Sequence, residues 1–204
     1  MKGDNQPVLI VIAGPNGSGK STITKDLEQR TGFPDIYINA DEIKKDEDIS
    51  DIEAWERAEQ QRADALNNRE SFAFETVFSH PSKINFIQQA KDAGYWVRLY
   101  FICTQDADIN VQRVRERHNT GGHDVPEDKI RNRYTRSMQI LSQTLSVVDE
   151  AEIFNNSWER PAMIAQKTHD GKVQVYSLHD KNKRSAWTKQ EIEKLLGVNH
   201  HNHR

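Results

Sequence analysis

The stretch AGPNGSGKST, residues 13 to 22, places glycines, a lysine and hydroxyls at the end of an apolar run, VLIVI. Gly14, Gly19, Lys20 and Ser21 fit the spacing G-x-x-x-x-G-K-[ST] of a phosphate-binding loop, or P-loop. Glycines let successive backbone N–H groups turn inward and form a nest for phosphate oxygens. The lysine supplies a mobile charge for the β- and γ-phosphates, and the serine hydroxyl is a ligand for Mg²⁺.

A helix is expected directly after this loop, over residues 20–30, so its positive N-terminal end would also face the phosphates. A glycine-rich turn without a ligand is the alternative, and the order strand, loop, helix argues against it. The predicted nucleotide-binding residues are Gly14, Pro15, Asn16, Gly17, Ser18, Gly19, Lys20, Ser21 and Thr22, with Ser21 as the metal ligand.

One carboxylate, Asp41, follows the strand candidate at 35–40. As a general base it would accept the proton of a substrate hydroxyl that attacks the γ-phosphate. As the N-cap of a helix that starts EIKK it would only stabilise that helix, because aspartate is a favoured cap. A third interpretation is a contact with Mg²⁺ through water. The residue types alone leave these interpretations open.

A second polar pair, Glu75 and Thr76, ends the strand candidate at 71–76. Neighbouring parallel strands end at the same edge, so we expect both residues beside the P-loop, where they suit hydrogen bonding to a polyhydroxylated substrate. The alternative is a polar strand end that faces water. No apolar strand ends in a clean Walker-B aspartate, since RLYFICT ends in Thr104. Metal ligation is therefore expected to rest on Ser21, the phosphates and water.

The stretch 113–137 is rich in basic residues, with seven basic against four acidic side chains. Spacing of four residues places two pairs each on one helix face, namely Arg113 with Arg117 and Lys129 with Arg133. Joined by the flexible turn GGHDVP, the two helices would form a lid over about 106–137 that closes on the transferred phosphoryl group and excludes water. A solvated helical hairpin is the alternative. RNA binding is disfavoured because Tyr134 is the one aromatic side chain of this stretch.

Alternating strand and helix patterns predict a three-layer α/β fold of the P-loop NTPase type, with a mostly parallel sheet. The expected strands are 8–13, 35–40, 71–76, 96–102 and 151–155, and the expected helices are 20–30, 51–69, 82–93, 106–118 and 127–149. After residue 156 a hairpin is expected around Asp170-Gly171, followed by a helix at 188–196. We interpret these as an appendage, about 158–204, of one domain that spans 1–204.

Composition excludes several classes of protein. The 204 residues are 35% hydrophobic and 29% charged, and the net charge of −3 gives no global attraction to nucleic acid or to an anionic membrane. The longest apolar runs, VLIVIA and LYFIC, are far too short to span a bilayer. The first residues, MKGDNQP, lack the apolar core of a secretory signal, and the single cysteine, Cys103, fits a reducing compartment. A cytoplasmic protein is expected.

Four motifs in order make a more specific pattern: VIAGPNGSGKST, YINADEI, FAFETVFS and R-x₃-R…GGHDVP-x₃-I-x₂-RY-x₂-S. Over about residues 7 to 157 the chain resembles the zeta toxin family of P-loop kinases, in particular its short members. The resemblance implies ATP- and Mg²⁺-dependent phosphorylation of a sugar hydroxyl of UDP-N-acetylglucosamine, usually under the control of an antitoxin protein. The alternatives are a kinase for another small acceptor, such as a nucleoside or an antibiotic, and a non-catalytic nucleotide-dependent switch.

The resemblance also assigns roles by position. Lys20 and Ser21 match the phosphate and Mg²⁺ groups, and Asp41 matches the family's catalytic aspartate, which favours the general-base interpretation. Glu75 and Thr76 match contacts to the sugar nucleotide, although longer members read Glu-Gly-Thr where this chain reads Glu-Thr. The arginines expected to close on the phosphates are Arg117 and Arg133, with Arg113 and Arg131 as weaker candidates. A further substrate-binding glutamate would be Glu56 or Glu59.

Overall fold

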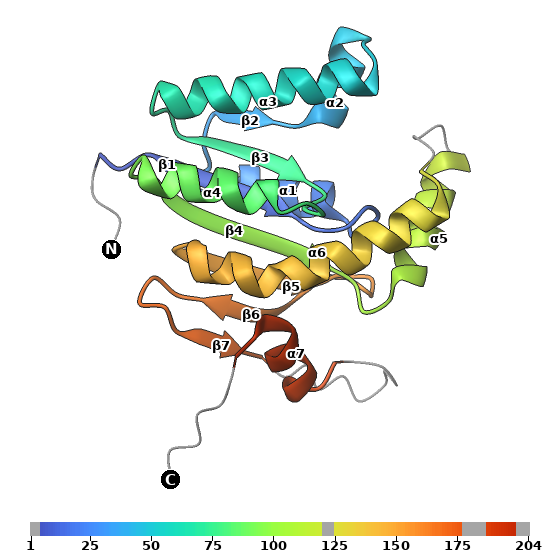
Figure 1. The fold of residues 1–204 in the computed structure, drawn as a ribbon. Helices are drawn as coiled ribbons and strands as arrows, with labels where there is room; N and C mark the ends of the chain where they lie inside the picture. Colours follow the sequence, from blue (N-terminus) through green and yellow to red (C-terminus); the bar gives the residue numbers. More distant parts are fainter. Residues whose placement is uncertain (1–4, 120–124, 177–186, 199–204) are drawn as a thin grey trace.

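The computed structural model describes residues 5–119, 125–176 and 187–198. Its centre is a sheet of seven strands in the order β2-β3-β1-β4-β5-β6-β7 (Figure 1). The strands are β1 Val8–Ala13, β2 Ile36–Ile38, β3 Phe72–Thr76, β4 Trp96–Cys103, β5 Glu150–Asn155, β6 Ala162–Lys167 and β7 Val173–Val175. The first five pair in parallel, and β6 and β7 join antiparallel at one edge.

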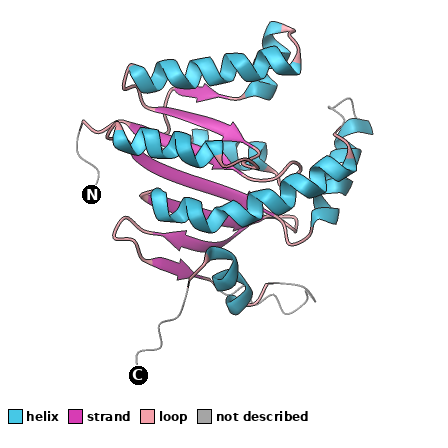
Figure 2. Cartoon of the chain, in the orientation of Figure 1, coloured by secondary structure: helices cyan, strands magenta, loops and turns pink. Residues whose placement is uncertain are grey.

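Helices cover both faces of this sheet (Figure 2). They are α1 Lys20–Glu28, α2 Ala40–Glu47, α3 Asp51–Asn67, α4 Ser82–Asp92, α5 Ala107–Asn119, α6 Glu127–Val147 and α7 Lys189–Leu196. Alternate residues of β1 face opposite ways, as the period of a strand requires. Leu9 and Val11 pack in the cluster that also holds residues of α3, α4, α6 and α7, whereas Ile10 and Ile12 pack with α1. The predicted three-layer α/β fold of the P-loop type is confirmed.

The carboxyl ends of the central strands meet at one edge, and this places the polar segments together. Ala13 of β1 lies opposite Thr76 of β3 and Phe101 of β4. The next residue, Gly14, donates its backbone N–H to the Thr76 carbonyl at 3.3 Å. The loop after β1 therefore emerges between the ends of β3 and β4, where an open α/β sheet binds its ligands.

The second strand is shorter than the sequence suggests, and this changes the position of Asp41. β2 stops at Ile38, and α2 begins at Ala40 with Asn39 as its N-cap. The Asn39 side chain accepts a hydrogen bond from the backbone N–H of Asp41 at 3.0 Å. The interpretation of Asp41 as the helix cap is therefore wrong, because Asn39 performs that role and Asp41 lies in the first helical turn.

The C-terminal segment forms the expected hairpin and helix. β6 and β7 flank a turn in which Gly171 has a φ of 82°. Thr188 caps α7 in a reciprocal pair of hydrogen bonds with Glu191. The terminal histidines of the sequence lie outside the described residues. Within residues 5–119, 125–176 and 187–198, every helix is too short or too polar to traverse a bilayer.

We expect Asn39→Ala to lower the free energy of unfolding by about 1 kcal/mol, because the first turn of α2 loses its side-chain acceptor. Asn39→Ser keeps a capping oxygen and should retain most of the stability. Urea denaturation of the two variants beside the parent tests this. An alanine variant as stable as the parent would show that the cap contributes nothing.

Candidate active site

The P-loop wraps around a buried lysine at the start of α1. The Lys20 side chain is 8% exposed, and its Nζ donates to the Pro15 carbonyl at 3.2 Å. The carboxylate of Glu75 lies 3.9 Å from the same Nζ. Burial is the main reason that the pKa of Lys20 is lowered, and the charge of Glu75 opposes this shift. A phosphate placed here would stabilise the charged form of the lysine further.

Two asparagines from distant elements hold the backbone of the loop. Asn110 of α5 donates from Nδ2 to the Asn16 carbonyl at 2.5 Å, and Asn156, after β5, donates to the Ser18 carbonyl at 2.8 Å. Gly17 and Gly19 have φ values of 74° and 89°. A Cβ on Gly17 would lie 2.6 Å from the Asn110 carbonyl oxygen, and one on Gly19 would lie 2.2 Å from Asn156 Nδ2. These asparagines can approach the loop only because it carries glycine at both positions.

Neither asparagine is among the residues predicted from the sequence, although the position of Asn156 in the chain indicates a place beside the P-loop. Asn156 directly follows a strand that ends at the same edge as the P-loop. Arg113, which sequence analysis offered as a weaker phosphate-binding candidate, donates from Nη1 to the Asn156 carbonyl at 2.7 Å. Arg113 therefore supports the residue that holds the loop, while its side chain also lines the cavity described below.

Glu75 belongs to a chain of hydrogen bonds that ends at the α2 cap. Asn39 Nδ2 donates to the Tyr37 hydroxyl at 3.1 Å, and that hydroxyl donates to Glu75 Oε2 at 3.2 Å. Burial raises the pKa of Tyr37, and the charge of Glu75 raises it further, so the phenol keeps its proton. Glu75 is 9% exposed. The alternative in which Glu75 is a strand end facing water is therefore wrong.

The hydroxyl of Thr76 has a local role in the loop that follows β3. Its Oγ1 accepts the backbone N–H of Phe78 at 3.3 Å. Phe78 is buried and has a positive φ of 57°, which is uncommon for a bulky residue. The loop that carries Thr76 and Val77 into the site is thus held in a constrained conformation, of the kind often found at binding sites.

A cavity of about 790 Å³ joins these groups. The predicted site residues that line it are Asn16, Gly17, Gly19, Lys20, Ser21, Thr22, Asp41, Glu75, Thr76, Arg117 and Arg133. Gly14, Pro15 and Ser18 belong to the loop but are buried beneath it. Among the described lining residues seven are Lys or Arg and three are Asp or Glu, in a chain whose net charge is −3. The cavity therefore concentrates positive charge that suits an anionic ligand.

The helices α5 and α6 form a hairpin that closes one side of this cavity. Val111, Val114 and Ile130 make a small apolar core between them. On the cavity side, Arg133 Nη1 donates to Asn16 Oδ1 at 3.2 Å. The charges of Arg117 and Arg133 both contribute to the lowered pKa of Lys20, so the two arginines lie close to the P-loop lysine. The predicted glycine hinge between the helices falls outside the described residues.

The base of the hairpin is fixed to the edge of the sheet. Tyr134 donates its hydroxyl to the Thr104 carbonyl at 2.7 Å, and Ser137 donates to the Val77 carbonyl at 2.7 Å. The hairpin is therefore attached through α6 to the ends of β4 and β3.

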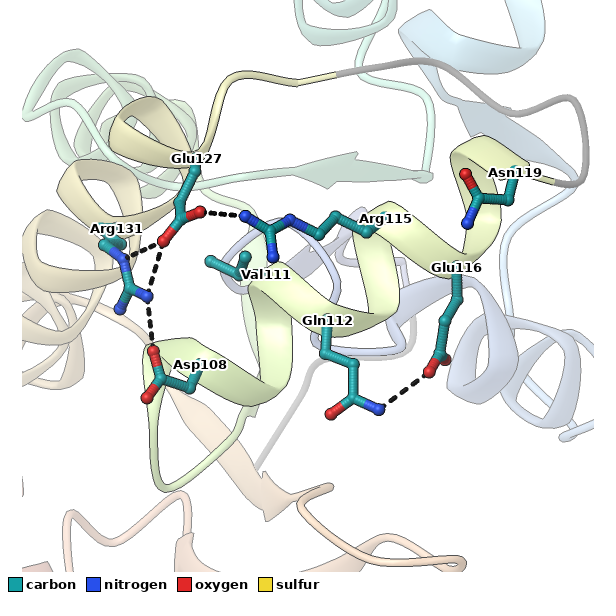
Figure 3. A pocket seen from close by; sticks show the side chains of 8 residues that line it. All are labelled: Asp108, Val111, Gln112, Arg115, Glu116, Asn119, Glu127 and Arg131. Carbon is teal, nitrogen blue, oxygen red and sulfur yellow. Dashed lines mark hydrogen bonds and ion pairs between the residues drawn. The ribbon is translucent and has the colours of Figure 1, made fainter.

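Arg131 lies on the other side of the hairpin, in the outer groove between the two helices (Figure 3). It pairs with Asp108 of α5 at 2.5 Å and with Glu127 of α6 at 2.8 Å. Arg115 pairs with the same Glu127. Arg131 is absent from the described lining of the cavity and instead joins the two helices, so its suggested role at the phosphates is wrong.

Ser21 is the hydroxyl available to a metal ion at the P-loop. Its side chain is exposed and lines the cavity at the start of α1. Among the described residues, no cluster of three or more His, Cys, Asp or Glu side chains could hold a metal. The donor set fits an Mg²⁺ ion that takes most of its ligands from phosphates and water, as is usual for this ion.

Fold and loop together define a P-loop protein that binds a nucleotide. The sequence profile described as Zeta toxin matches residues 1–179, and the chain belongs to the zeta toxin family. An uncharacterized protein of Haemophilus influenzae is 31% identical over 134 residues, which are 63% of this chain and 94% of that protein. The family and the P-loop support an ATP-dependent kinase.

Solved structures show the same fold. A chain of the crystal structure of AvrRxo1-ORF1:AvrRxo1-ORF2 with sulphate ions superposes with a TM-score of 0.65 at 16% identity, over 94% of this chain and 64% of that chain. This chain therefore spans slightly less than two thirds of the length of that neighbour. A structure from the PezAT toxin-antitoxin system of Streptococcus pneumoniae superposes with a TM-score of 0.56 at 16% identity, over 97% of this chain and 81% of that one.

We expect Asn156→Ala to weaken ATP binding by about 2- to 10-fold, because the loop loses a hydrogen bond to the Ser18 carbonyl. Ser157→Ala is the matched control, since Ser157 bonds to Gln105 and Asn155 but not to the P-loop. Calorimetric titration with ATP tests both variants. Equal affinities in the two would show that Asn156 does not hold the loop.

Proposed function

We propose that this chain transfers the γ-phosphoryl group of ATP to a hydroxyl of a small anionic acceptor, a UDP-activated sugar such as UDP-N-acetylglucosamine. The observation that carries the proposal is that one cavity joins the P-loop to Asp41 and continues along α3 and the end of β3. Its volume, about 790 Å³, lies in the upper part of the range for small-molecule sites. A transferase must bind an acceptor beside the triphosphate and so needs space for a second ligand. A nucleotide-dependent switch does not need this space.

Each group of the cavity has a task in such a transfer. The loop N–H groups and Lys20 would bind the β- and γ-phosphates, and Ser21 would hold Mg²⁺. The Mg²⁺ ion, when bound, supplies positive charge that neutralises the phosphate oxygens. Arg117 and Arg133 would stabilise the charge of the phosphoryl group in the transition state. Asp41 would orient the acceptor hydroxyl and accept its proton.

A protein partner is also part of the proposal. The chain belongs to the zeta toxin family, and one of the solved neighbours named above comes from the PezAT toxin-antitoxin system. We infer that an antitoxin protein controls this chain as well, in the cytoplasm, where ATP and nucleotide sugars are available.

We expect Asp41→Asn to lower phosphoryl transfer by roughly 10²- to 10⁴-fold while ATP affinity is unchanged, because only the basic carboxylate is lost. Since Asn39 caps α2, the melting temperature should stay near that of the parent. The measurement is transfer from γ-labelled ATP to UDP-N-acetylglucosamine, resolved by mass. Lys20→Ala is the control that should abolish turnover through the P-loop itself. Near-parent transfer by Asp41→Asn would remove Asp41 from the mechanism.

We expect Arg117→Ala and Arg133→Ala each to reduce kcat by about 10- to 100-fold and to weaken ATP binding less, because their charges act mainly on the transition state. Arg136→Ala is the matched control: Arg136 is an exposed arginine of α6 outside the described lining of the cavity. Steady-state kinetics beside ATP titration separates the two effects. A loss of ATP affinity with an unchanged kcat would mean that these arginines only bind the ground state.

A further inference from the structure

A cluster of three charges lies away from the P-loop, with its two cations in the wall of the cavity. Glu59 of α3 accepts from Arg62 of the same helix at 2.5 Å and from Lys83 of α4 at 2.6 Å. The side chains of Arg62 and Lys83 are 5% and 17% exposed. The guanidinium carbon of Arg62 also lies 5.1 Å from the ring centroid of Phe74. Two cations thus share one carboxylate and leave a net positive charge.

The two cations face the cavity, but their shared carboxylate does not line it. Arg62 and Lys83 both belong to the lining, from which Glu59 is absent among the described residues. Among the described residues, Glu59 is the one carboxylate whose charge raises the pKa of Arg62 and of Lys83. A guanidinium carries five N–H donors and an ammonium three, so one carboxylate leaves donors for a ligand.

The neighbouring face of α3 leaves room for that ligand. Asp51, Ala54, Trp55, Ala58 and Arg62 line the cavity at helical spacing. From the first to the last of these residues the helix extends about 16 Å. Ala54 and Ala58 are small, and Trp55, which is 55% exposed, lies at the opposite end from the buried Arg62. This wall therefore forms an elongated site with its positive charge at the buried end.

We propose that Arg62 and Lys83 bind an anionic group, a phosphate or a carboxylate, of the phosphoryl acceptor, and that Glu59 positions the two cations. The assignment of this ligand as the acceptor rests on the proposed kinase function. The subsite would select acceptors by charge at a distance from the reacting hydroxyl. None of its three residues belongs to the P-loop or to the helical hairpin.

The burial of the two cations supports this role. Burial lowers the pKa of Arg62 and of Lys83, and their contacts with Glu59 oppose that shift. For Glu59, burial raises the pKa, but the hydrogen bond from Lys83 and the charge of Arg62 outweigh it. A second anion beside the two cations would offset their desolvation, which one carboxylate offsets only in part.

Anion binding tests the subsite without reference to transfer. Inorganic pyrophosphate is titrated calorimetrically into the protein saturated with a non-hydrolysable ATP analogue. We expect Lys83→Gln to bind it about tenfold more weakly, and Lys83→Arg to retain most of the affinity. Glu59→Gln should bind at least as tightly as the parent, because the glutamine oxygen still accepts from both cations and positions them while the competing negative charge is gone. Lys91→Gln is the matched control, as Lys91 of the same helix pairs with Asp149 outside the cavity.

Equal binding by the parent and Lys83→Gln, or no binding by the parent, would overturn the proposal. A purely structural ion cluster would lower the melting temperature in both Glu59→Gln and Lys83→Gln and leave pyrophosphate affinity alone, which would also overturn it.

Transfer from γ-labelled ATP is then compared for UDP-N-acetylglucosamine and the neutral N-acetylglucosamine. We expect Lys83→Gln to raise the KM of the anionic acceptor about tenfold with an unchanged KM for ATP. Equal kcat/KM for the charged and the neutral sugar would overturn the acceptor role. Absence of transfer to either sugar would contradict the proposed function, while the pyrophosphate titration still decides whether the anion subsite exists.

Discussion

The site depends on one buried lysine that must remain charged. Lys20 lies almost fully out of solvent, which penalises its ammonium form, and the carboxylate of Glu75 is the nearby charge that offsets this most. Glu75 is held by hydrogen bonds from Tyr37 and Thr24. The carboxylate therefore serves first as the fixed counter-charge of the P-loop lysine. A triphosphate would join an ion pair that already exists rather than meet an isolated charge.

That lysine can be positioned only if the loop around it is rigid, and the rigidity comes from elsewhere in the fold. Asn110 and Asn156 donate to loop carbonyls across 94 and 138 residues of sequence. Asn110 belongs to the helical hairpin and Asn156 follows the end of β5, so the loop is tied to both the hairpin and the sheet. A movement of the hairpin would therefore displace the backbone of the P-loop, because Asn110 joins the two through its hydrogen bond to the Asn16 carbonyl.

These long-range contacts explain which parts of the molecule could be predicted. Strands such as 72–76 and the P-loop itself follow from local patterns, because alternation and glycine spacing are visible within ten residues. The first residue of α2 could not be decided from the sequence, because asparagine and aspartate are both favoured N-caps. Asn39 is the cap because β2 already ends at Ile38, so that the helix begins at Ala40. Asn110 carries no local signal, because the partner of an amide within a helix is known only from the fold, whereas Asn156 directly follows a predicted strand that ends beside the P-loop.

The distribution of arginines illustrates the same limit and also gives the cavity its character. On α6, Arg131 and Arg133 are two residues apart and so point to different sides of the helix. Arg131 forms ion pairs with Asp108 and Glu127, whereas Arg133 donates a hydrogen bond to Asn16 of the P-loop. The number of basic residues in a stretch of sequence therefore does not predict an anion-binding site unless the acidic residues that pair with them are known. Among the described residues that line the cavity, the cations outnumber the carboxylates by seven to three. This local excess of positive charge, in a chain whose net charge is −3, is the reason that the electrostatics of the cavity favour anionic ligands.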